Sequence, residues 1–168
     1  EIFEVDPSFV EQQIDSVMSD IGAHAVKTGM LYNRHIIKTV AKKVTEHRIK
    51  NLVVDPVMIS ATGASLLRKE DVKALIQHLL PLAHIVTPNP PEAEALSGIK
   101  IETLDDMKRA AKAIAGLGTK NVVVTGGDLP GRAVDVFYSG KRFTVMEGPH
   151  IETKNTHGTG CSYSSAIA

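Results

Sequence analysis

Near residue 160 of the 168-residue sequence, glycine, threonine and cysteine stand in an order that suits anion binding. Gly158 and Gly160 flank Thr159, Cys161 follows, and small residues continue as the start of a helix. Glycines let the backbone approach a ligand closely, and a helix N-terminus presents N–H groups and a positive dipole end to an anion. The same field favours a thiolate. The stretch predicts an anion-binding turn with a base or nucleophile at its edge, or a glycine-rich turn with a buried structural cysteine.

Acidic and amide side chains form a second candidate group. Asp55 follows an apolar segment, and Asn89 and Glu92 lie three residues apart where a turn leads into a helix. Magnesium prefers oxygen ligands and needs only one or two carboxylates beside its waters. These residues predict a Mg²⁺ site. Two other interpretations stay open: Glu92 also suits the first turn of a helix, and Asp55 also suits a turn before proline.

The elements that must position these residues alternate between helices and apolar strands. Hydrophobic spacing predicts helices over residues 7–21, 33–48 and about 69–80, a short helix that ends at 96, and a helix that Thr103 caps and that includes Ile114. It also predicts strands over 23–28, 51–56, 84–87 and 121–125, and a hairpin of 134–139 with 142–146. Such alternation is typical of a parallel sheet with helices on both faces. The sequence therefore predicts one α/β domain over residues 1–168, a three-layer, doubly wound and mainly parallel sheet.

The loops after these strands carry the polar residues. In open α/β sheets, ligands bind beyond the carboxyl ends of the strands, so the four loops and the Gly158–Cys161 turn are expected on one rim. Gly126 and Gly127, after the fourth strand, either bring backbone close to a nucleotide or form a tight turn. The sequence contains neither a P-loop nor a dinucleotide-binding glycine pattern after the first strand.

Composition narrows the class of protein. Lysine plus arginine and aspartate plus glutamate both number 19, and this zero net charge argues against nucleic acid or an anionic membrane as the main partner. A single cysteine fits a reducing compartment, so a cytoplasmic location is expected. No apolar run approaches the roughly 20 residues that span a bilayer. The seven histidines fall at no metal-ligand spacing, and only His157 lies within the predicted anion-binding turn.

Four segments together resemble the hydroxymethylpyrimidine and phosphomethylpyrimidine kinases of thiamine biosynthesis, within the ribokinase-like superfamily. The resemblance covers nearly the whole chain and rests on residues 26–31, 53–58, 87–96 and 153–161. The last segment is the most specific, because most ribokinase-like enzymes carry aspartate where this chain has Cys161. The resemblance implies an ATP-dependent kinase that phosphorylates a primary alcohol on an aminopyrimidine and then phosphorylates the resulting monophosphate.

The resemblance also implies roles for single residues. Gly158, Thr159 and Gly160 would form the anion hole under the transferring phosphate, and Cys161 would activate or position the substrate hydroxyl. Asn89 and Glu92 match the metal-associated motif of the family. The remaining matches place Gly29, Met30 and Val57 in the pyrimidine pocket, and Thr125, Gly126, Gly127 and Lys154 on the nucleotide side.

The chain departs from the family pattern at two kinds of position. The family usually has Lys-Gly-Gly where this chain has Thr125-Gly126-Gly127, so a basic phosphate contact is absent or supplied elsewhere. Family members also have an earlier glycine-rich strand with pyrimidine-binding residues, and later helices that complete the nucleotide pocket. The chain is therefore expected to be a partial ribokinase-like domain, truncated at both ends.

Two alternative functions remain open at this point. One is a pyridoxal or pyridoxine kinase of the same superfamily. The other is a non-catalytic binding or regulatory domain with a kinase fold, against which the intact Cys161, Asn89 and Glu92 argue. The resemblance implies a small-molecule substrate, ATP and Mg²⁺ as ligands, and a homodimer as the assembly.

Overall fold

A six-stranded sheet in the order β1-β2-β3-β4-β5-β6 forms the centre of the computed structural model, which describes residues 3–58, 66–126, 133–153 and 155–168. The strands β1 (Val26–Thr28), β2 (Leu52–Val54), β3 (Ile85–Val86) and β4 (Asn121–Val124) run parallel to one another. The antiparallel pair β5 (Ala133–Tyr138) and β6 (Phe143–Gly148) extends the sheet beyond β4. The predicted mainly parallel sheet and its antiparallel hairpin are confirmed.

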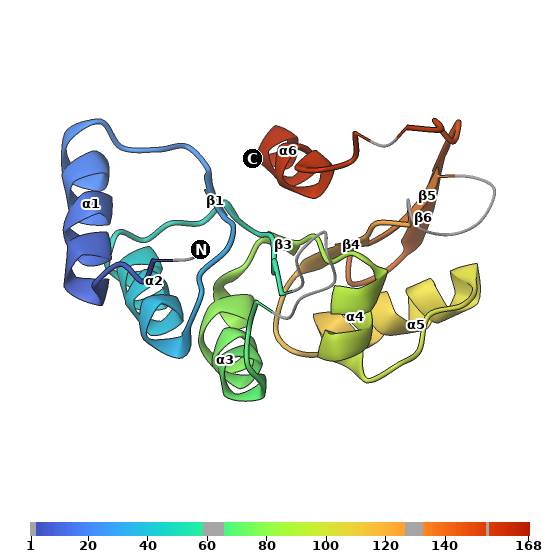
Figure 1. Ribbon diagram of the computed structural model, residues 1–168, viewed down its shortest axis with the longest axis horizontal. Coiled ribbons are helices and arrows are strands. Elements are labelled where there is room, and N and C mark those ends of the chain that lie inside the picture. The colour runs from blue at the N-terminus through green and yellow to red at the C-terminus, as the bar shows by residue number, and fades with distance from the viewer. Residues whose placement is uncertain (1–2, 59–65, 127–132, 154) are drawn as a thin grey trace.

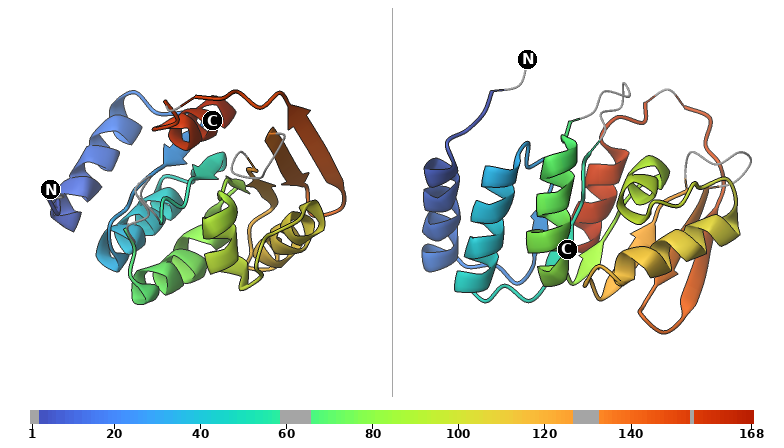
Figure 2. Two further views of the ribbon diagram at one scale, coloured as in Figure 1. Left: turned by 45° about the vertical axis from the view of Figure 1, so that its right-hand side comes forward. Right: turned by 90° about the horizontal axis from the view of Figure 1, so that it is seen from below.

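Helices cover both faces of this sheet, as predicted for a doubly wound fold. Figure 1 shows α2, α3, α4 and α5 on one face and α6 alone on the other, with α1 outside α2; the two views of Figure 2 agree. The helices are α1 (Pro7–Asp20), α2 (Arg34–Glu46), α3 (Lys69–Ala74), α4 (Pro90–Ser97), α5 (Leu104–Ala115) and α6 (Thr159–Ile167). In the described parts of the chain, no helix is long and apolar enough to cross a membrane.

Successive strand residues point to opposite faces, and this alternation divides the core. Leu52 and Val54 of β2 belong to the large core between the sheet and α2–α5, which we call the main core. Val53 belongs instead to a small cluster with Ile85 and Val123, beneath α6. We call this set the α6-side cluster, and Phe137 and Tyr163 pack against it. The α6-side cluster is therefore the apolar surface against which the helix that carries Cys161 packs.

Local caps explain where several helices begin. Asp6 caps α1, Asn33 caps α2, and Thr103 forms a capping box with Asp106 at the start of α5. The apolar face of α2 is buried in full, at Ile36, Ile37, Val40, Ala41 and Val44.

Only part of the apolar face of helix α1 is covered. Val10 and Ile14 pack against the main core, but Val17 is 50% exposed and Ile21 is 81% exposed. The helix lies on the outer side of α2, where only part of its apolar stripe meets a partner. Val17 and Ile21, which lie on the apolar face of this helix, are therefore left largely uncovered.

The predicted helix over residues 69–80 is interrupted. α3 ends at Ala74 and continues as one π-helical stretch, η1 (Leu75–Leu79), and one 3₁₀ turn, η2 (Leu80–Leu82). Pro81 lies in the second of these and has no N–H group to continue α-helical hydrogen bonding. The segment still buries Leu75, Leu79 and Leu80.

Candidate active site

The predicted anion-binding turn forms the start of α6. Gly158 is the N-cap residue with φ +84°, a left-handed conformation that glycine adopts at little cost, and the helix begins at Thr159. Cys161 lies in the first turn and is exposed. The first N–H groups of an α-helix have no intrahelical acceptor. The arrangement predicted for Gly158, Thr159, Gly160 and Cys161 is therefore present, on the face of the sheet that α6 covers.

Asp55 connects this helix to the sheet. Its side chain is 7% exposed and follows β2 at the carboxyl end. One carboxylate oxygen, Oδ2, accepts a hydrogen bond from Ser164 Oγ at 2.9 Å and lies 3.4 Å from Lys27 Nζ. Asp55 is thus held between the first strand and the Cys161 helix.

Sequence reasoning had not singled out Lys27 or Ser164. Lys27 lies in the middle of β1, and its register partner is Val53 of the α6-side cluster. A charged residue in a short apolar strand is a recognisable signal, because an unpaired ammonium group is costly to bury. Ser164 stands among small residues of α6 and carries no such signal, although it is fully buried.

The electrostatic environment of Cys161 opposes ionisation. Burial raises the pKa of its thiol above the ordinary value, and the neighbouring Asp55 carboxylate raises that pKa further. Lys27 acts in the opposite direction, and Glu92 adds a smaller raising effect. The prediction of a thiolate-favouring field is therefore wrong for the protein without ligands, because two carboxylates lie near the helix start.

Asn89 and Glu92 form a capping box at the start of α4. Asn89 Oδ1 accepts the Glu92 N–H at 2.9 Å, while Glu92 Oε2 accepts the Asn89 N–H at 3.1 Å. Glu92 Oε1 accepts the Met58 N–H at 3.0 Å. Burial raises the pKa of Glu92 to about 7, although the hydrogen bonds from the Asn89 and Met58 N–H groups lower it. The Asp55 carboxylate adds to the increase. Glu92 therefore does lie in the first turn of a helix, which was one of the two interpretations left open for it.

These oxygens also bear on the predicted Mg²⁺ site. The described residues contain no group of three histidine, cysteine, aspartate or glutamate side chains that would hold a metal. Asp55 and Glu92 nevertheless act on each other electrostatically. The hydroxyls of Thr28 and Thr87, at the carboxyl ends of β1 and β3, are buried and have no hydrogen-bond partner in the described part of the chain. Two carboxylates and uncommitted buried hydroxyls are a donor set that fits a hard cation with water ligands.

The predicted substrate-side residues follow β1 and β2. Gly29 and Met30 come directly after β1, and Met30 is 40% exposed. Val57 has φ +38°, a strained conformation for a β-branched residue. Strained backbone of this kind concentrates at ligand sites. The three residues lie at the ends of neighbouring parallel strands, on the same rim as Asp55.

The predicted nucleotide-side residues are described only in part. The Thr125 N–H donates to the Pro88 carbonyl oxygen at 3.1 Å, which joins the loops after β3 and β4. A Cβ atom at Gly126 would lie 2.0 Å from the Val134 carbonyl oxygen, so glycine is required there. Gly127 and Lys154 lie outside the described residues.

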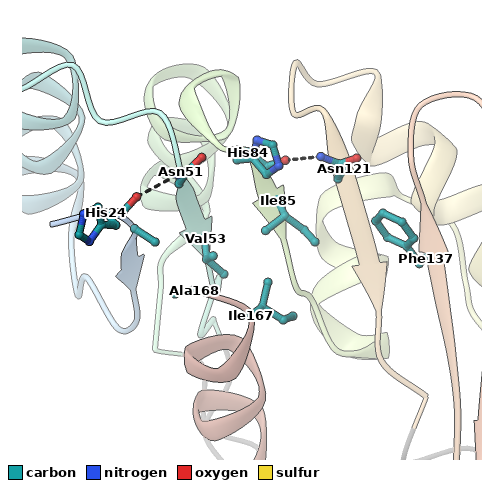
Figure 3. A pocket seen from close by; sticks show the side chains of 10 residues that line it. His24, Asn51, Val53, His84, Ile85, Asn121, Phe137, Ile167 and Ala168 are labelled. Carbon is teal, nitrogen blue, oxygen red and sulfur yellow. Dashed lines mark hydrogen bonds between the residues drawn. The ribbon is translucent and has the colours of Figure 1, made fainter.

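One cavity lies away from all the predicted site residues. It has a volume of about 460 Å³ and is lined by His24, Asn51, His84, Asn121 and several apolar side chains (Figure 3). Asn51 donates to the His24 carbonyl oxygen at 2.9 Å, and Asn121 donates to that of His84 at 2.8 Å. These residues precede or begin the strands, so the cavity is at the opposite end of the sheet from Asp55 and Cys161.

The phosphomethylpyrimidine kinase family model matches residues 1–168. The chain is 47% identical over 165 residues to the thiamine biosynthesis bifunctional protein ThiED of Geobacter sulfurreducens, covering 98% of this chain and 34% of that protein. It is 45% identical over 160 residues to the hydroxymethylpyrimidine/phosphomethylpyrimidine kinase of Bacillus subtilis, covering 94% of this chain and 59% of that protein.

A solved structure agrees with the sequence comparisons. An ADP complex of Bacillus subtilis pyridoxal kinase is similar with a TM-score of 0.92 and 44% identity, covering 99% of this chain and 63% of the other. The chain thus spans less than two thirds of the length of these relatives. The family match over the whole chain and the ribokinase-like α/β sheet lead to one conclusion: this chain belongs to the phosphomethylpyrimidine kinase family.

Proposed function

We propose that the protein phosphorylates 4-amino-5-hydroxymethyl-2-methylpyrimidine with ATP, and then phosphorylates the resulting monophosphate, in thiamine biosynthesis. The observation that carries this proposal is Cys161 in the first turn of α6, beside the buried Asp55, in a chain that matches the family over residues 1–168. The similar pyridoxal kinase structure contains ADP, which supports ATP as the phosphate donor.

The chain's own residues supply positioning and charge stabilisation, which phosphoryl transfer chiefly requires. N–H groups of Gly158, Gly160 and Cys161 stabilise the charge that develops on the transferring phosphate, while the Thr159 N–H donates to the Thr156 carbonyl oxygen at 3.2 Å. Cys161 orients the substrate hydroxyl and accepts its proton. Because Asp55 and Glu92 both raise the pKa of Cys161, neutralising these carboxylates favours the thiolate form.

Asp55 and Glu92 are the residues that would hold Mg²⁺, with the buried Thr28 and Thr87 hydroxyls on the same rim. Held there, the cation would supply positive charge that partly neutralises the ATP phosphates. Asn89 contributes to this arrangement by fixing Glu92, because its side-chain oxygen is committed to the Glu92 N–H. Gly29, Met30 and Val57 contribute to the alcohol side, and Thr125, Gly126, Gly127 and Lys154 to the nucleotide side. The substrates are small molecules, and we expect a cytoplasmic location. We also expect a homodimer, which analytical ultracentrifugation would test.

A pyridoxal or pyridoxine kinase is the second candidate, because the pyridoxal kinase of Bacillus subtilis has a TM-score of 0.92. The deciding experiment incubates the full-length protein with ATP and Mg²⁺ and compares kcat/KM for the aminopyrimidine alcohol and for pyridoxal. A clear preference for the aminopyrimidine, with a second phosphorylation of its monophosphate, supports the first proposal. Preference for pyridoxal, with no second phosphorylation, overturns it.

A further inference from the structure

Ser164 is the one fully buried residue of α6. The other residues of this helix are exposed, apart from the half-buried Tyr163. The helix packs chiefly on β2, so its buried serine faces the sheet. A buried hydroxyl without a hydrogen bond is costly, and a serine contributes little apolar packing. The hydrogen bonds of Ser164 therefore bear directly on where α6 lies.

The acceptor for the Ser164 hydroxyl is Asp55. Ser164 Oγ lies 2.9 Å from Asp55 Oδ2 and 3.1 Å from the Cys161 carbonyl oxygen. A hydroxyl has one proton and a carboxylate is the stronger acceptor, so the proton is donated to Asp55. The Cys161 carbonyl oxygen already accepts a hydrogen bond from Ser165 Oγ at 2.7 Å. What Ser164 adds to the helix is thus a contact with the sheet, across 109 positions of the chain.

Lys27 holds the same carboxylate oxygen from the side of β1. Its Nζ lies 3.4 Å from Asp55 Oδ2, and the side chains of Lys27 and Asp55 are 18% and 8% exposed. Among the residues that the structure describes, Lys27 is the only cation within ion-pair distance of Asp55. A buried carboxylate that loses its partner charge is strongly disfavoured, so this pair acts as a unit.

The ammonium of Lys27 also lies beside the loop on the predicted alcohol side, because a Cβ atom at Gly29 would be 3.4 Å from Lys27 Nζ. The main chain supports the same arrangement, since the Asp55 N–H donates to the Thr28 carbonyl oxygen at 3.1 Å. The loop after β1, the end of β2 and the first turns of α6 therefore meet at one carboxylate.

We propose that Ser164 and Lys27 are positioning residues, which hold Asp55 at a fixed distance from the anion-binding turn. This inference rests on the proposed function, in which Asp55 would hold the cation and the turn receives the transferring phosphate. The bond from Ser164 Oγ to Asp55 Oδ2 joins these two parts of the site directly. Without it they move independently, and the reactants are aligned for a smaller fraction of the time.

Ser164→Ala in the full-length protein tests the serine. We expect kcat to fall about tenfold while KM for ATP and for the alcohol changes less than about twofold, because misalignment slows the chemical step more than binding. Ser165→Ala is the matched control: it makes the same change on the same helix and removes an exposed hydroxyl that contacts only the Cys161 carbonyl oxygen among the described residues. Wild-type kcat in Ser164→Ala, or an equal loss in Ser165→Ala, overturns the proposal.

Lys27→Met tests the lysine, because it removes the charge and keeps an unbranched side chain. We expect kcat to fall about tenfold here too. Combined with Ser164→Ala, the loss should be smaller than the product of the two single losses, since both residues act on one oxygen. Lys100→Met is the control, because Lys100 pairs with Glu102 at the surface. Wild-type kcat in Lys27→Met, or losses that multiply in the double variant, overturns the shared role.

A second measurement does not depend on turnover. Without ligands, hydrogen exchange of the α6 amides should be at least about tenfold faster in Ser164→Ala than in Ser165→Ala, while the α5 amides exchange equally in both. Equal exchange of α6 in the two variants, or acceleration of α5 together with α6, overturns the proposal. Failure of the wild type to phosphorylate the aminopyrimidine overturns the proposed substrate instead, and the exchange result still decides whether Ser164 fixes α6 to the sheet.

Discussion

Cys161 is the residue on which the proposed chemistry depends most directly. Its thiol lies at a helix start, which favours an anion, but burial and Asp55 raise its pKa. A cysteine in such a place needs its carboxylate neighbours neutralised before it acts as a base. Its reactivity is therefore set by Asp55 and Lys27 as much as by the helix.

Cys161→Ala in the full-length protein should lower kcat by about 10²- to 10⁴-fold with a modest change in nucleotide KM, because a positioned general base contributes on that scale. Steady-state kinetics with each substrate varied in turn would measure this. Ser162→Ala, at the next position, is the control and should turn over at the wild-type rate. Wild-type kcat in Cys161→Ala would remove the thiol from the mechanism.

Glu92 makes stability depend on pH. Its pKa is about 7 in the folded chain against an ordinary 4.5, so the folded state binds the proton more tightly. The resulting stabilisation is complete below about pH 4.5 and is lost as the pH rises through 7, with a total of roughly 3 kcal/mol. Urea unfolding of the wild type between pH 5 and pH 8 should show this loss, and Glu92→Gln should show a flatter dependence. Equal slopes for the two proteins would contradict the assignment.

The sequence predicted the residues at this site better than their contacts. The order of Gly158 to Cys161 predicted a helix start, and Asn89 with Glu92 predicted a turn into a helix, because both depend on short-range geometry. The Lys27–Asp55–Ser164 contacts join residues far apart in the chain, and only the folded sheet brings them together. The pKa of Cys161 was predicted in the wrong direction for the same reason.

Among the helices, α1 is held in place by charged side chains as well as by the packing of Val10 and Ile14. Lys43 of α2 is 5% exposed and its Nζ lies 2.9 Å from Glu11 and 2.8 Å from Asp15. Its third carboxylate is Glu46, at 2.7 Å. These interactions raise the pKa of Lys43 well above its ordinary range, so the ammonium stays charged. Lys42 Nζ also lies 2.7 Å from Glu11, and His47 Nε2 lies 2.6 Å from Asp15, so Lys43 is the most buried of several side chains that join α1 to α2.

Lys43→Met should loosen α1 while the main core stays folded, because the methionine side chain fills similar space without the charge. Hydrogen exchange of the Pro7–Asp20 amides should accelerate, and that of α5 should not change. Lys42→Met is the matched control, since Lys42 is 55% exposed and pairs with Glu11 at the surface. Equal acceleration in both variants would show that Lys43 has no special role.

Gly126→Ala should strongly destabilise the turn between β4 and β5, because the new Cβ would lie 2.0 Å from the Val134 carbonyl oxygen. Overpacking commonly costs about 1–3 kcal/mol, and backbone atoms cannot move aside as side chains do. Gly148→Ala is the control, since nothing lies within 4 Å of a Cβ there. Thermal unfolding of both variants would measure the difference. If Gly126→Ala and Gly148→Ala had the same thermal unfolding midpoint, the close approach of Gly126 to the Val134 carbonyl oxygen would be excluded.

Across the whole molecule, the sheet separates a large core from a small one. Val122 and Val123 are neighbours on β4, both buried, with Val122 in the main core and Val123 under α6. The pair therefore allows the two faces to be probed with the same chemical change. Comparing the two variants also distinguishes a general loss of folding stability from a displacement of the helix that carries Cys161.

Val122→Ala and Val123→Ala should each lower the free energy of unfolding by about 1–3 kcal/mol. Only Val123→Ala should also lower kcat, because the α6-side cluster seats the helix that carries Cys161. Urea unfolding and steady-state kinetics of the full-length protein would measure both effects. An equal loss of kcat in Val122→Ala would assign the effect to general stability.

Alternating periodicity predicted the α/β sheet and the hairpin, since long periodic segments such as α2 and α5 encode their buried face directly. The two-core division is visible only afterwards, when Val53, Ile85 and Val123 are seen on neighbouring strands. Helix α1 was predicted, but the exposure of Val17 and Ile21 was not, because an apolar stripe does not show how much of it a partner covers. The cavity at the amino ends of the strands could not be predicted either, because no sequence motif indicates it.

The hairpin strand β6 has a practical consequence for handling the protein. In the described sheet it pairs only with β5, and its Phe143, Val145 and Met146 side chains are 37–39% exposed. An apolar strand at a sheet edge is a template for intermolecular pairing, so β6 is where aggregation would begin in concentrated solution. Val145→Lys places a charge on this edge and should raise the concentration at which light scattering first increases, which makes solubility a property of one strand.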